Sequence, residues 1–359
     1  MPPAETSVLE RDLHPELLDL TFKNLDGTTN PTQKEYLGGP KQVQAMMMAH
    51  KGKVVFETYP GMYPSDTHVW MSASKTTVSL TATMLWEDGK LDFDQPITTY
   101  VPYLKGTVWD KVTVKNAMNM SAGLDIEETF ESLTNPDSFI AGFMTRTFES
   151  GHTSWREWVK LAKALPNEEP GDQFRYSSSL TQLLVVMVEN ITQMPWQEFW
   201  KQGVWSKIGA KYPYMIGLAP DGTPGAAGMN ITTPEDMLRY AMLYTPSWNK
   251  VAKEQVISDK QMKCIQTLGN PKAYHRSTEE AYGKRWFGEV PYMNTAQWDH
   301  TFEDGAMFKH GNMGQGIYVD PERDFCGQYF GLATNDEAIS GADHSPGYMR
   351  AAAKLLAGK

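Results

Sequence analysis

The sequence contains little cysteine, no excess of basic residues and no long apolar run. Cys264 and Cys326 are its only cysteines, and two isolated thiols are typical of buried, unreactive side chains rather than of a disulfide framework or a metal site. Asp and Glu number 43 against 33 Lys and Arg, so the formal net charge is −10. That charge opposes binding to phosphate backbones, and we expect no nucleic-acid partner.

The chain also lacks the segments that carry proteins into or across membranes. Its densest apolar run, Leu183 to Val188, has six residues, whereas a membrane span needs about 18. The first twenty residues carry five acidic side chains and no sustained apolar stretch, which is unlike a secretory signal. We therefore expect a cytoplasmic protein without membrane association.

Several catalytic and nucleotide-binding motifs are missing as well. The sequence has no G-x-S-x-G elbow, no H-E-x-x-H zinc motif, no Walker A loop and no G-x-G-x-x-G. Its eight histidines are scattered singly. These absences disfavour α/β-hydrolases, zinc peptidases and nucleotide-dependent enzymes, and we expect neither a metal nor a cofactor.

What the chain does contain is a globular composition, 41% apolar and 21% charged, with β-prone segments near both ends and helical segments between them. The predicted strands are 42–49, 54–59, 316–319 and 326–332. The predicted helices are 75–86, a helix that begins after Ser154 and runs toward Leu165, 180–191, 234–243 and 351–356. This order predicts an α/β domain built from residues 1–112 and 246–359, with a mainly helical domain of residues 113–245 inserted between them.

One short motif, Ser72-Ala73-Ser74-Lys75, has the S-x-x-K form in which a serine is paired with a lysine. Ser72 opens an apolar helix, where free N–H groups favour developing negative charge, and Lys75 falls on the same helical face one turn away. A serine hydroxyl needs a neighbouring base, and a lysine can be that base when burial or a second cation lowers its pKa. The alternative interpretation is a helix cap followed by a solvated lysine.

A second S-x-x-K runs from Ser247 to Lys250. It follows Pro246 in a polar segment between two predicted helices, where serine is a common helix cap. We interpret Ser247 as such a cap, which leaves Ser72 as the candidate nucleophile.

The surroundings of Ser72 resemble the class C β-lactamase and penicillin-binding-protein superfamily in five blocks that occur in the same order, together covering much of residues 40–335. The blocks are 71–104, 112–128, 169–210, 221–244 and 308–335. Within the superfamily, Tyr176-Ser177-Ser178 and the turn from Gly311 to Gln315 look most like the branch of 6-aminohexanoate-dimer hydrolases and carboxylesterases. The resemblance implies a serine β-lactamase-like α/β (α+β) fold, with an antiparallel sheet flanked by helices and an inserted, mainly helical domain.

The resemblance also implies roles for particular residues. Ser72 corresponds to the nucleophile, Lys75 to its base, and Tyr176 to the phenol that carries the proton to the leaving group. The backbone N–H groups of Ser72 and Asn312 correspond to the oxyanion hole, and the implied substrate-binding residues are Ser178, Lys309, His310 and Gly311. Tyr63 and Tyr292 also have a Tyr-x-Ser or Tyr-x-Asn form, but they lie outside the matching blocks.

Two positions depart from the β-lactamase pattern. Ser178 stands where those enzymes carry the asparagine of Tyr-x-Asn, and a hydroxyl replaces an amide. Lys309-His310-Gly311 stands in place of Lys-Thr-Gly, so the bulkier His310 should alter the edge that binds a substrate carboxylate. An alignment shifted by one residue would put His310 at the lysine position; we prefer the first alignment because Gly311 then precedes the oxyanion donor.

These observations predict a serine hydrolase that forms an acyl-enzyme at Ser72 and cleaves carboxylic esters, with acyl transfer to another acceptor as a variant. A linear amide hydrolase of the 6-aminohexanoate-dimer type is the second alternative, and a β-lactamase or D,D-peptidase is the third. The non-enzyme alternative is a catalytically silent scaffold or ligand-binding protein on the same fold. The expected partner is a small ester or amide, and a homodimer is compatible with the sequence.

Overall fold

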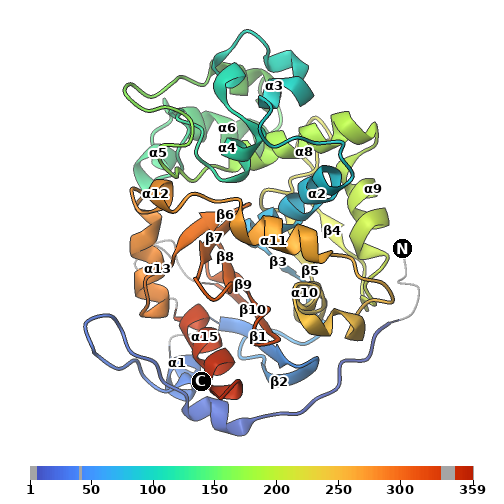
Figure 1. The fold of residues 1–359 in the computed structure, drawn as a ribbon, viewed down its shortest axis with the longest axis vertical. Helices are drawn as coiled ribbons and strands as arrows, with labels where there is room; N and C mark the ends of the chain where they lie inside the picture. The colour runs from blue at the N-terminus through green and yellow to red at the C-terminus, as the bar shows by residue number, and fades with distance from the viewer. Residues whose placement is uncertain (1–5, 40–42, 333–343, 359) are drawn as a thin grey trace.

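The computed structural model describes residues 6–39, 43–332 and 344–358. Figure 1 shows a lower part built around a β-sheet and an upper part made of helices and loops. The C-terminal helix α15 (Ser345–Leu356) packs against strands β1, β9 and β10 of this sheet. Both ends of the sequence therefore build the α/β part of the molecule.

The main sheet, within the described residues, has seven antiparallel strands in the order β2-β1-β10-β9-β8-β7-β6. Their bounds are β1 (Val43–His50), β2 (Lys53–Thr58), β6 (Met293–Thr295), β7 (Trp298–Thr301), β8 (Met307–Gly311), β9 (Gln315–Asp320) and β10 (Phe325–Gly331). A smaller sheet has the order β3-β5-β4, formed by β3 (His68–Val69), β4 (Met215–Ile216) and β5 (Asn230–Thr232). Because β1 pairs with β10, the N-terminal hairpin continues the C-terminal meander.

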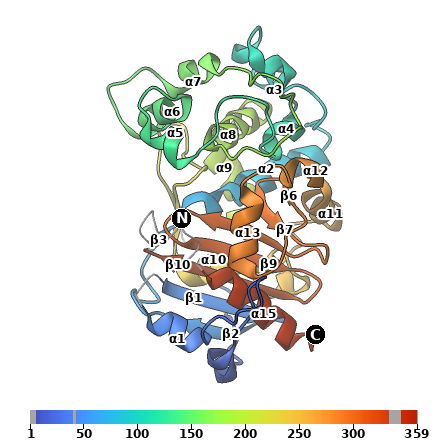
Figure 2. The same ribbon diagram turned by 90° about the vertical axis from the view of Figure 1, so that its left-hand side faces the viewer.

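Helices cover both faces of the main sheet, and each face has its own apolar core. On one face, α10 (Pro234–Met242) packs on β1 and β10, and the helix α2 (Lys75–Glu87) packs against α11 (Asp259–Thr267). On the other face, α13 (Glu279–Phe287) and α15 pack together, as Figure 2 shows. Strands covered on both faces explain why β1 and β10 are almost entirely buried.

The upper part of the molecule surrounds the apolar helix α8 (Ser178–Thr192), which packs against α2, α4 and α9. The other helices are α1 (Gln33–Gly38), α3 (Ile97–Tyr100), α4 (Val114–Met118), α5 (Phe130–Thr134), α6 (Phe139–Phe148), α7 (Trp155–Trp158), α9 (Trp196–Trp200) and α12 (Pro271–Tyr274). Since α2 contacts both α8 in the upper part and α11, which itself packs on β6 of the main sheet, it links the two parts of the molecule.

The predicted antiparallel sheet flanked by helices is present, and so are most of the predicted elements. The predicted helices 75–86, 180–191, 234–243 and 351–356 correspond to α2, α8, α10 and α15. The four predicted strands correspond to β1, β2, β9 and β10. Gln42, the first residue of the first predicted strand, lies outside the described residues, as do the last residues of the block 308–335.

The helix predicted after Ser154 is much shorter than expected. Ser154 does cap it, but α7 ends at Trp158 and is followed by a single 3-10 turn, Val159–Leu161. Beyond this turn the chain is extended, because Leu165 N–H donates to the Gly123 carbonyl at 2.9 Å and Lys163 accepts from Asp125 at 2.8 Å. Pairing with a distant segment thus replaces the last helical turns.

Ser247 is not the helix cap that we predicted. It lies inside a 3-10 segment, Pro246–Lys250, and its hydroxyl donates to Asp324 Oδ2 at 2.6 Å. This contact connects the segment to the turn between β9 and β10. The two segments are far apart in the sequence, so the local pattern could not predict the contact. The serine therefore has a structural contact in the α/β part.

The boundary predicted at residue 245 can be compared with the packing of α10. This helix falls inside the predicted insert of residues 113–245, yet it lies on strands β1, β9 and β10 of the main sheet. The division of the chain at 112 and 245 stays a prediction.

Both cysteines are free and buried, as expected. Burial raises the pKa of the Cys264 thiol to about 11, and it also raises that of Cys326 well above the usual value. In the described ranges, none of the helices combines the length and apolar character that a bilayer crossing requires. The same ranges contain no group of three or more His, Cys, Asp or Glu side chains placed to hold a metal ion.

The buried ion pair between Asp236 and Arg239 should be important for stability. Asp236 accepts from Arg239 Nη1 at 2.9 Å and from the backbone N–H groups of Lys211 and Tyr212 at 2.8 and 2.9 Å. We expect Asp236→Ala to lower the free energy of unfolding by about 3–5 kcal/mol, because it leaves a buried guanidinium short of a partner. Urea unfolding followed by circular dichroism measures this, and a loss below about 1 kcal/mol, the range of an exposed pair, would contradict it.

Candidate active site

Ser72 lies in a one-turn 3-10 segment, Met71–Ser74, that leads directly into α2. Met71 has φ 47°, in the left-handed region that residues other than glycine rarely adopt. Trp70, which is fully buried, anchors this turn to β5 through hydrogen bonds of 2.8 Å from both its backbone N–H and its indole N–H. The anchored turn leaves Ser72 half-buried at the start of the helix.

Lys75, the first residue of α2, directs its amine at Ser72. Its Nζ lies 3.0 Å from Ser72 Oγ, 2.9 Å from Ser178 Oγ and 2.7 Å from the carbonyl oxygen of Ala227. A neutral amine offers two hydrogens and one lone pair. It can donate to Ala227 and to Ser178 while it accepts the hydroxyl proton of Ser72, which is the arrangement that a general base requires.

Burial controls the protonation of Lys75. The side chain is completely buried, and this desolvation lowers the pKa of its ammonium group from 10.5 to about 7. The carboxylates of Glu128 and Asp299 oppose the shift, while the cation of Lys309 adds to it. A large fraction of Lys75 is therefore neutral near neutral pH, as a lysine base must be.

Tyr176 reaches the same point from the segment before α8. Its phenol is within hydrogen-bonding reach of Ser72, and Lys309 Nζ donates to Tyr176 Oη at 3.2 Å. Desolvation, with the negative charges of Asp299 and Glu128 adding to it, raises the pKa of Tyr176 well above its usual 10. The phenol thus keeps its proton at neutral pH and can donate it to a leaving group as it gains another.

A buried ion pair lies behind Tyr176. Lys309 on β8 is fully buried, and its Nζ is 2.5 Å from Asp299 Oδ1 on the neighbouring strand β7. The second oxygen, Asp299 Oδ2, accepts from the backbone N–H of His310 at 2.9 Å. Asp299 therefore fixes both the cation that contacts Tyr176 and the end of the strand that carries it.

The end of β8 lies against the turn that carries Ser72. A Cβ atom on Gly311 would lie 2.4 Å from the carbonyl oxygen of Trp70, so only glycine permits this approach. The approach brings the β8 end, and the backbone of Asn312 after it, toward Ser72. The assignment of the backbone N–H groups of Ser72 and Asn312 as an oxyanion hole stays a prediction.

The structure joins most, but not all, of the predicted site residues. Ser72, Lys75, Tyr176, Ser178 and Lys309 form one connected cluster. The ring of His310 is not part of it. Alternation along a strand sends neighbouring side chains to opposite faces, so Lys309 faces the cluster while His310 stacks on Trp286, with ring centres 4.5 Å apart.

Sequence analysis missed several groups that contact or surround this cluster. They are the carbonyl of Ala227, the carboxylate of Asp299, and the carboxylates of Glu128 and Glu279. Glu128 accepts the backbone N–H of Ser178 and donates its own N–H to the carbonyl of Tyr176 at 2.8 Å. Glu128 is the last residue of the block 112–128, so the resemblance could have indicated that it lies near the site. The resemblance could not have indicated its contacts with Tyr176 and Ser178.

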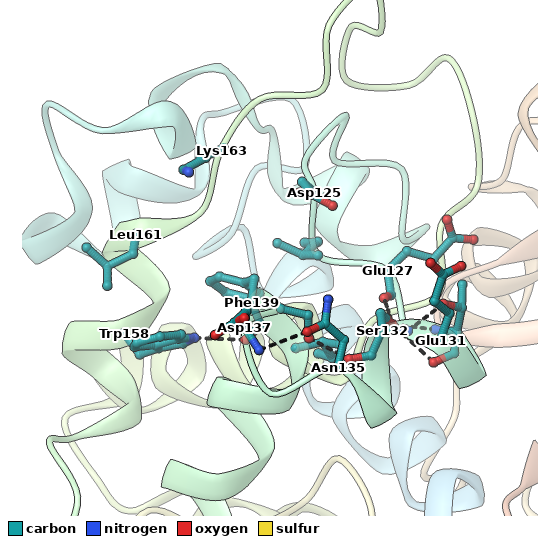
Figure 3. Close-up of a pocket in the computed structure, with 14 residues that line it drawn as sticks. Asp125, Glu127, Glu131, Ser132, Asn135, Asp137, Phe139, Trp158, Leu161 and Lys163 are labelled. Atoms are coloured by element: carbon teal, nitrogen blue, oxygen red, sulfur yellow. Dashed lines mark hydrogen bonds between the residues drawn. The ribbon is translucent and has the colours of Figure 1, made fainter.

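A surface pocket of about 730 Å³ lies nearby in the helical part. Figure 3 shows Trp158 and Leu161 on one side of it and the acidic residues Glu127 and Glu131 on the other. Neither Ser72, Lys75 nor Tyr176 lines this pocket. Glu127 lines this pocket and directly precedes Glu128, so the pocket adjoins the segment that reaches the Ser72 cluster.

The fold and the site together define a class of protein, the hydrolases with a β-lactamase-like α/β fold. The chain belongs to the Beta-lactamase family, whose model matches residues 42–351. It is 27% identical over 288 residues to a 6-aminohexanoate-dimer hydrolase of Paenarthrobacter ureafaciens, covering 78% of this chain and 70% of the relative. It is 28% identical over 207 residues to a beta-lactamase of Providencia stuartii, covering 55% of this chain and 47% of the relative.

Solved structures agree on the fold. A Bacillus anthracis protein, assigned provisionally as a 6-aminohexanoate-dimer hydrolase, superposes with a TM-score of 0.77 at 22% identity, covering 99% of this chain and 89% of that one. EstCE1, a hydrolase with promiscuous acyltransferase activity, has a TM-score of 0.62 at 16% identity and covers 87% and 93%. EstA from Arthrobacter nitroguajacolicus has a TM-score of 0.62 at 16% identity and covers 91% and 95%.

Proposed function

We propose that this protein is a serine hydrolase that cleaves small carboxylic esters through an acyl-enzyme on Ser72. The observation that carries the proposal is the contact of 3.0 Å between Ser72 Oγ and the buried amine of Lys75. A buried lysine that shares its proton with a serine supplies the base that a hydroxyl nucleophile needs. A silent scaffold on the same fold would have no use for a desolvated lysine in this position.

In the first half of the reaction, Ser72 Oγ attacks the ester carbonyl carbon and its proton passes to Lys75. The bond from Ser72 Oγ to the carbonyl carbon gives a tetrahedral intermediate with a negatively charged oxygen. This intermediate collapses as the bond to the alcohol oxygen breaks; Tyr176 donates its proton to that oxygen, and Lys75 passes the proton taken from Ser72 to Tyr176. The backbone N–H groups of Ser72 and Asn312 would bind the oxyanion, and losing one such donor typically raises a barrier by about 3 kcal/mol.

The second half reverses these proton transfers with water as the nucleophile. Water gives a proton to the Tyr176–Lys75 pair and attacks the acyl carbon, and the carboxylic acid leaves as Ser72 Oγ regains its proton. An alcohol in place of water would give acyl transfer. Ser178, which contacts Lys75 at 2.9 Å, holds the amine in position for both halves.

Esters are our first choice because an ester leaving group needs the least protonation, and because one similar fold belongs to EstCE1, a hydrolase with promiscuous acyltransferase activity. A linear amide is the second candidate. It is favoured by the relative that matches over 288 residues, a 6-aminohexanoate-dimer hydrolase. A β-lactam or a D-alanyl peptide ranks third, since Ser178 and His310 stand where the β-lactamase pattern has asparagine and threonine.

A side-by-side substrate panel tests the proposal. We expect p-nitrophenyl acetate and butyrate to be turned over with a kcat/KM at least about 100-fold above that of a linear amide and of nitrocefin, because activated esters have the lower intrinsic barrier. A slowly deacylating reagent should add its acyl mass to the peptide that contains Ser72. A label on Ser247, or faster cleavage of nitrocefin than of either ester, would refute the assignment.

A further inference from the structure

Glu128 places a negative charge beside the reacting groups. Its carboxylate accepts the backbone N–H of Ser178, the residue whose hydroxyl contacts Lys75. Among the charges around Lys75, that of Glu128 acts most strongly, and it also acts on Tyr176. The side chain is only partly buried, so a bound substrate can reach it.

No cation in the described residues neutralises Glu128. Arg175, the nearest arginine in sequence, pairs instead with Glu127 and Glu168, the latter at 2.7 Å. Glu128 itself forms no ion pair within the described part of the chain. When Lys75 is in its neutral, reactive form, the charge of Glu128 is therefore uncompensated at the site.

Lys309, the other cation of the site, is already occupied. It is fully buried, and Asp299 holds its ammonium group at 2.5 Å while Tyr176 accepts a second hydrogen bond. A substrate carboxylate would have to displace Asp299, which is itself 3% exposed, to use this cation. The ion pair contributes no net charge, and it offers no anchor for an anion.

Glu279, at the start of α13, faces the same region. Burial, together with the charge of Asp299, raises the pKa of Glu279 to about 8. It is therefore largely protonated at neutral pH. Glu128, which accepts the Ser178 N–H and forms no ion pair within the described residues, remains as the carboxylate whose field a substrate meets.

We infer that Glu128 determines the charge selectivity of the site, which accepts neutral and cationic substrates and rejects substrates that carry a carboxylate near the scissile bond. The inference rests on the proposed ester hydrolysis at Ser72 and deepens it. An anion next to Glu128 is repelled and a cation there is attracted, and both effects are stronger on the side where the neighbouring Lys75 is fully buried. The selectivity for substrate charge thus follows from the carboxylate of Glu128, which has no ion-pair partner in the described residues, and from Lys309, which is already paired with Asp299.

Two matched ester series test the inference. In the first, phenyl acetate is compared with its ring derivatives that bear a meta-trimethylammonium or a meta-carboxylate group, so that the charge lies on the leaving group. In the second, p-nitrophenyl octanoate is compared with its analogues that end in a trimethylammonium or a carboxylate group, so that the charge lies on the acyl group. Each kcat/KM is divided by the rate of alkaline hydrolysis of the same ester, which removes differences in intrinsic reactivity.

We expect a cation-to-anion ratio of at least tenfold in one or both series, measured at pH 7.5. Glu128→Gln keeps the acceptor oxygen for the Ser178 N–H and should lower that ratio at least threefold, whereas Glu128→Asp should retain most of it. Glu149→Gln removes the same charge from the exposed surface and should leave the ratio unchanged. In Glu128→Gln the acid limb of kcat/KM should also move to lower pH, because Glu128 no longer stabilises the ammonium form of Lys75.

The outcomes separate the two proposals. Hydrolysis of the neutral esters with a ratio near one in the unmodified protein, or an equal fall of the ratio in Glu128→Gln and Glu149→Gln, overturns the charge selectivity and leaves ester hydrolysis intact. If no neutral ester is hydrolysed in either series, ester hydrolysis is refuted, and the selectivity falls with it.

Discussion

Ester hydrolysis should disappear when Ser72 is replaced by alanine, with kcat/KM lower by about 10⁴- to 10⁶-fold, the range seen when an enzyme loses its nucleophile. The methyl group cannot form the acyl-enzyme, and the other hydroxyl that contacts Lys75, that of Ser178, is buried. Steady-state hydrolysis of p-nitrophenyl butyrate measures the loss, and intact-protein mass spectrometry should show no acyl adduct.

The chain offers a matched control for this change in its second S-x-x-K. Ser247 donates to Asp324 and lies in the α/β part, where its hydroxyl has no lysine base of this kind. Ser247→Ala should keep kcat/KM within about twofold, with at most a loss of about 1 kcal/mol of stability from the missing hydrogen bond. Equal activity in Ser72→Ala and the unmodified protein would end the proposed mechanism.

Replacing Lys75 by methionine, which has a similar length, should lower kcat/KM by about 10³-fold or more, because general-base catalysis alone contributes about 10²–10⁴-fold. The same amine also holds Ser178 and the Ala227 carbonyl. Circular dichroism should report a folded protein, since removing a buried amine also removes its desolvation cost. Activity above a tenth of the unmodified level would contradict a lysine base.

The pH dependence of kcat/KM is an independent test of Lys75 as the general base. The neutral amine is the active form, and its pKa is about 7, so kcat/KM should rise through pH 7 and approach a plateau above pH 8. The pKa of Tyr176 is raised well above 10, so its ionisation should not reduce activity below that pH. A profile that falls from pH 6 to pH 9 in a stable protein would refute the assignment, and the rise should vanish in the residual activity of Lys75→Met.

Local patterns were sufficient for the elements that position the nucleophile. The period of apolar residues after Lys75 predicted α2, and a spacing of three residues placed the lysine beside the serine, since both follow from the geometry of one helical turn. The strands predicted at 42–49 and 54–59 correspond to β1 and β2 for the same local reason. The predicted length of the helix after Ser154 was wrong, because residues 163–165 form hydrogen bonds with a segment about forty residues earlier.

The serine–lysine pair, the order of the family blocks and the fold class could all be predicted from the amino-acid sequence, because each depends on short-range spacing or on the identity of residues. The protonation of Lys75 could not be predicted in this way, because it depends on how distant segments pack around the amine. Lys75 contacts Ser178 and Ala227, which belong to other segments of the chain. In the same way Lys309 contacts Asp299, and Glu128 contacts the backbone of Ser178. No local spacing predicts these contacts. Desolvation lowers the pKa of an amine only when packing removes its water, and packing is a property of the whole chain.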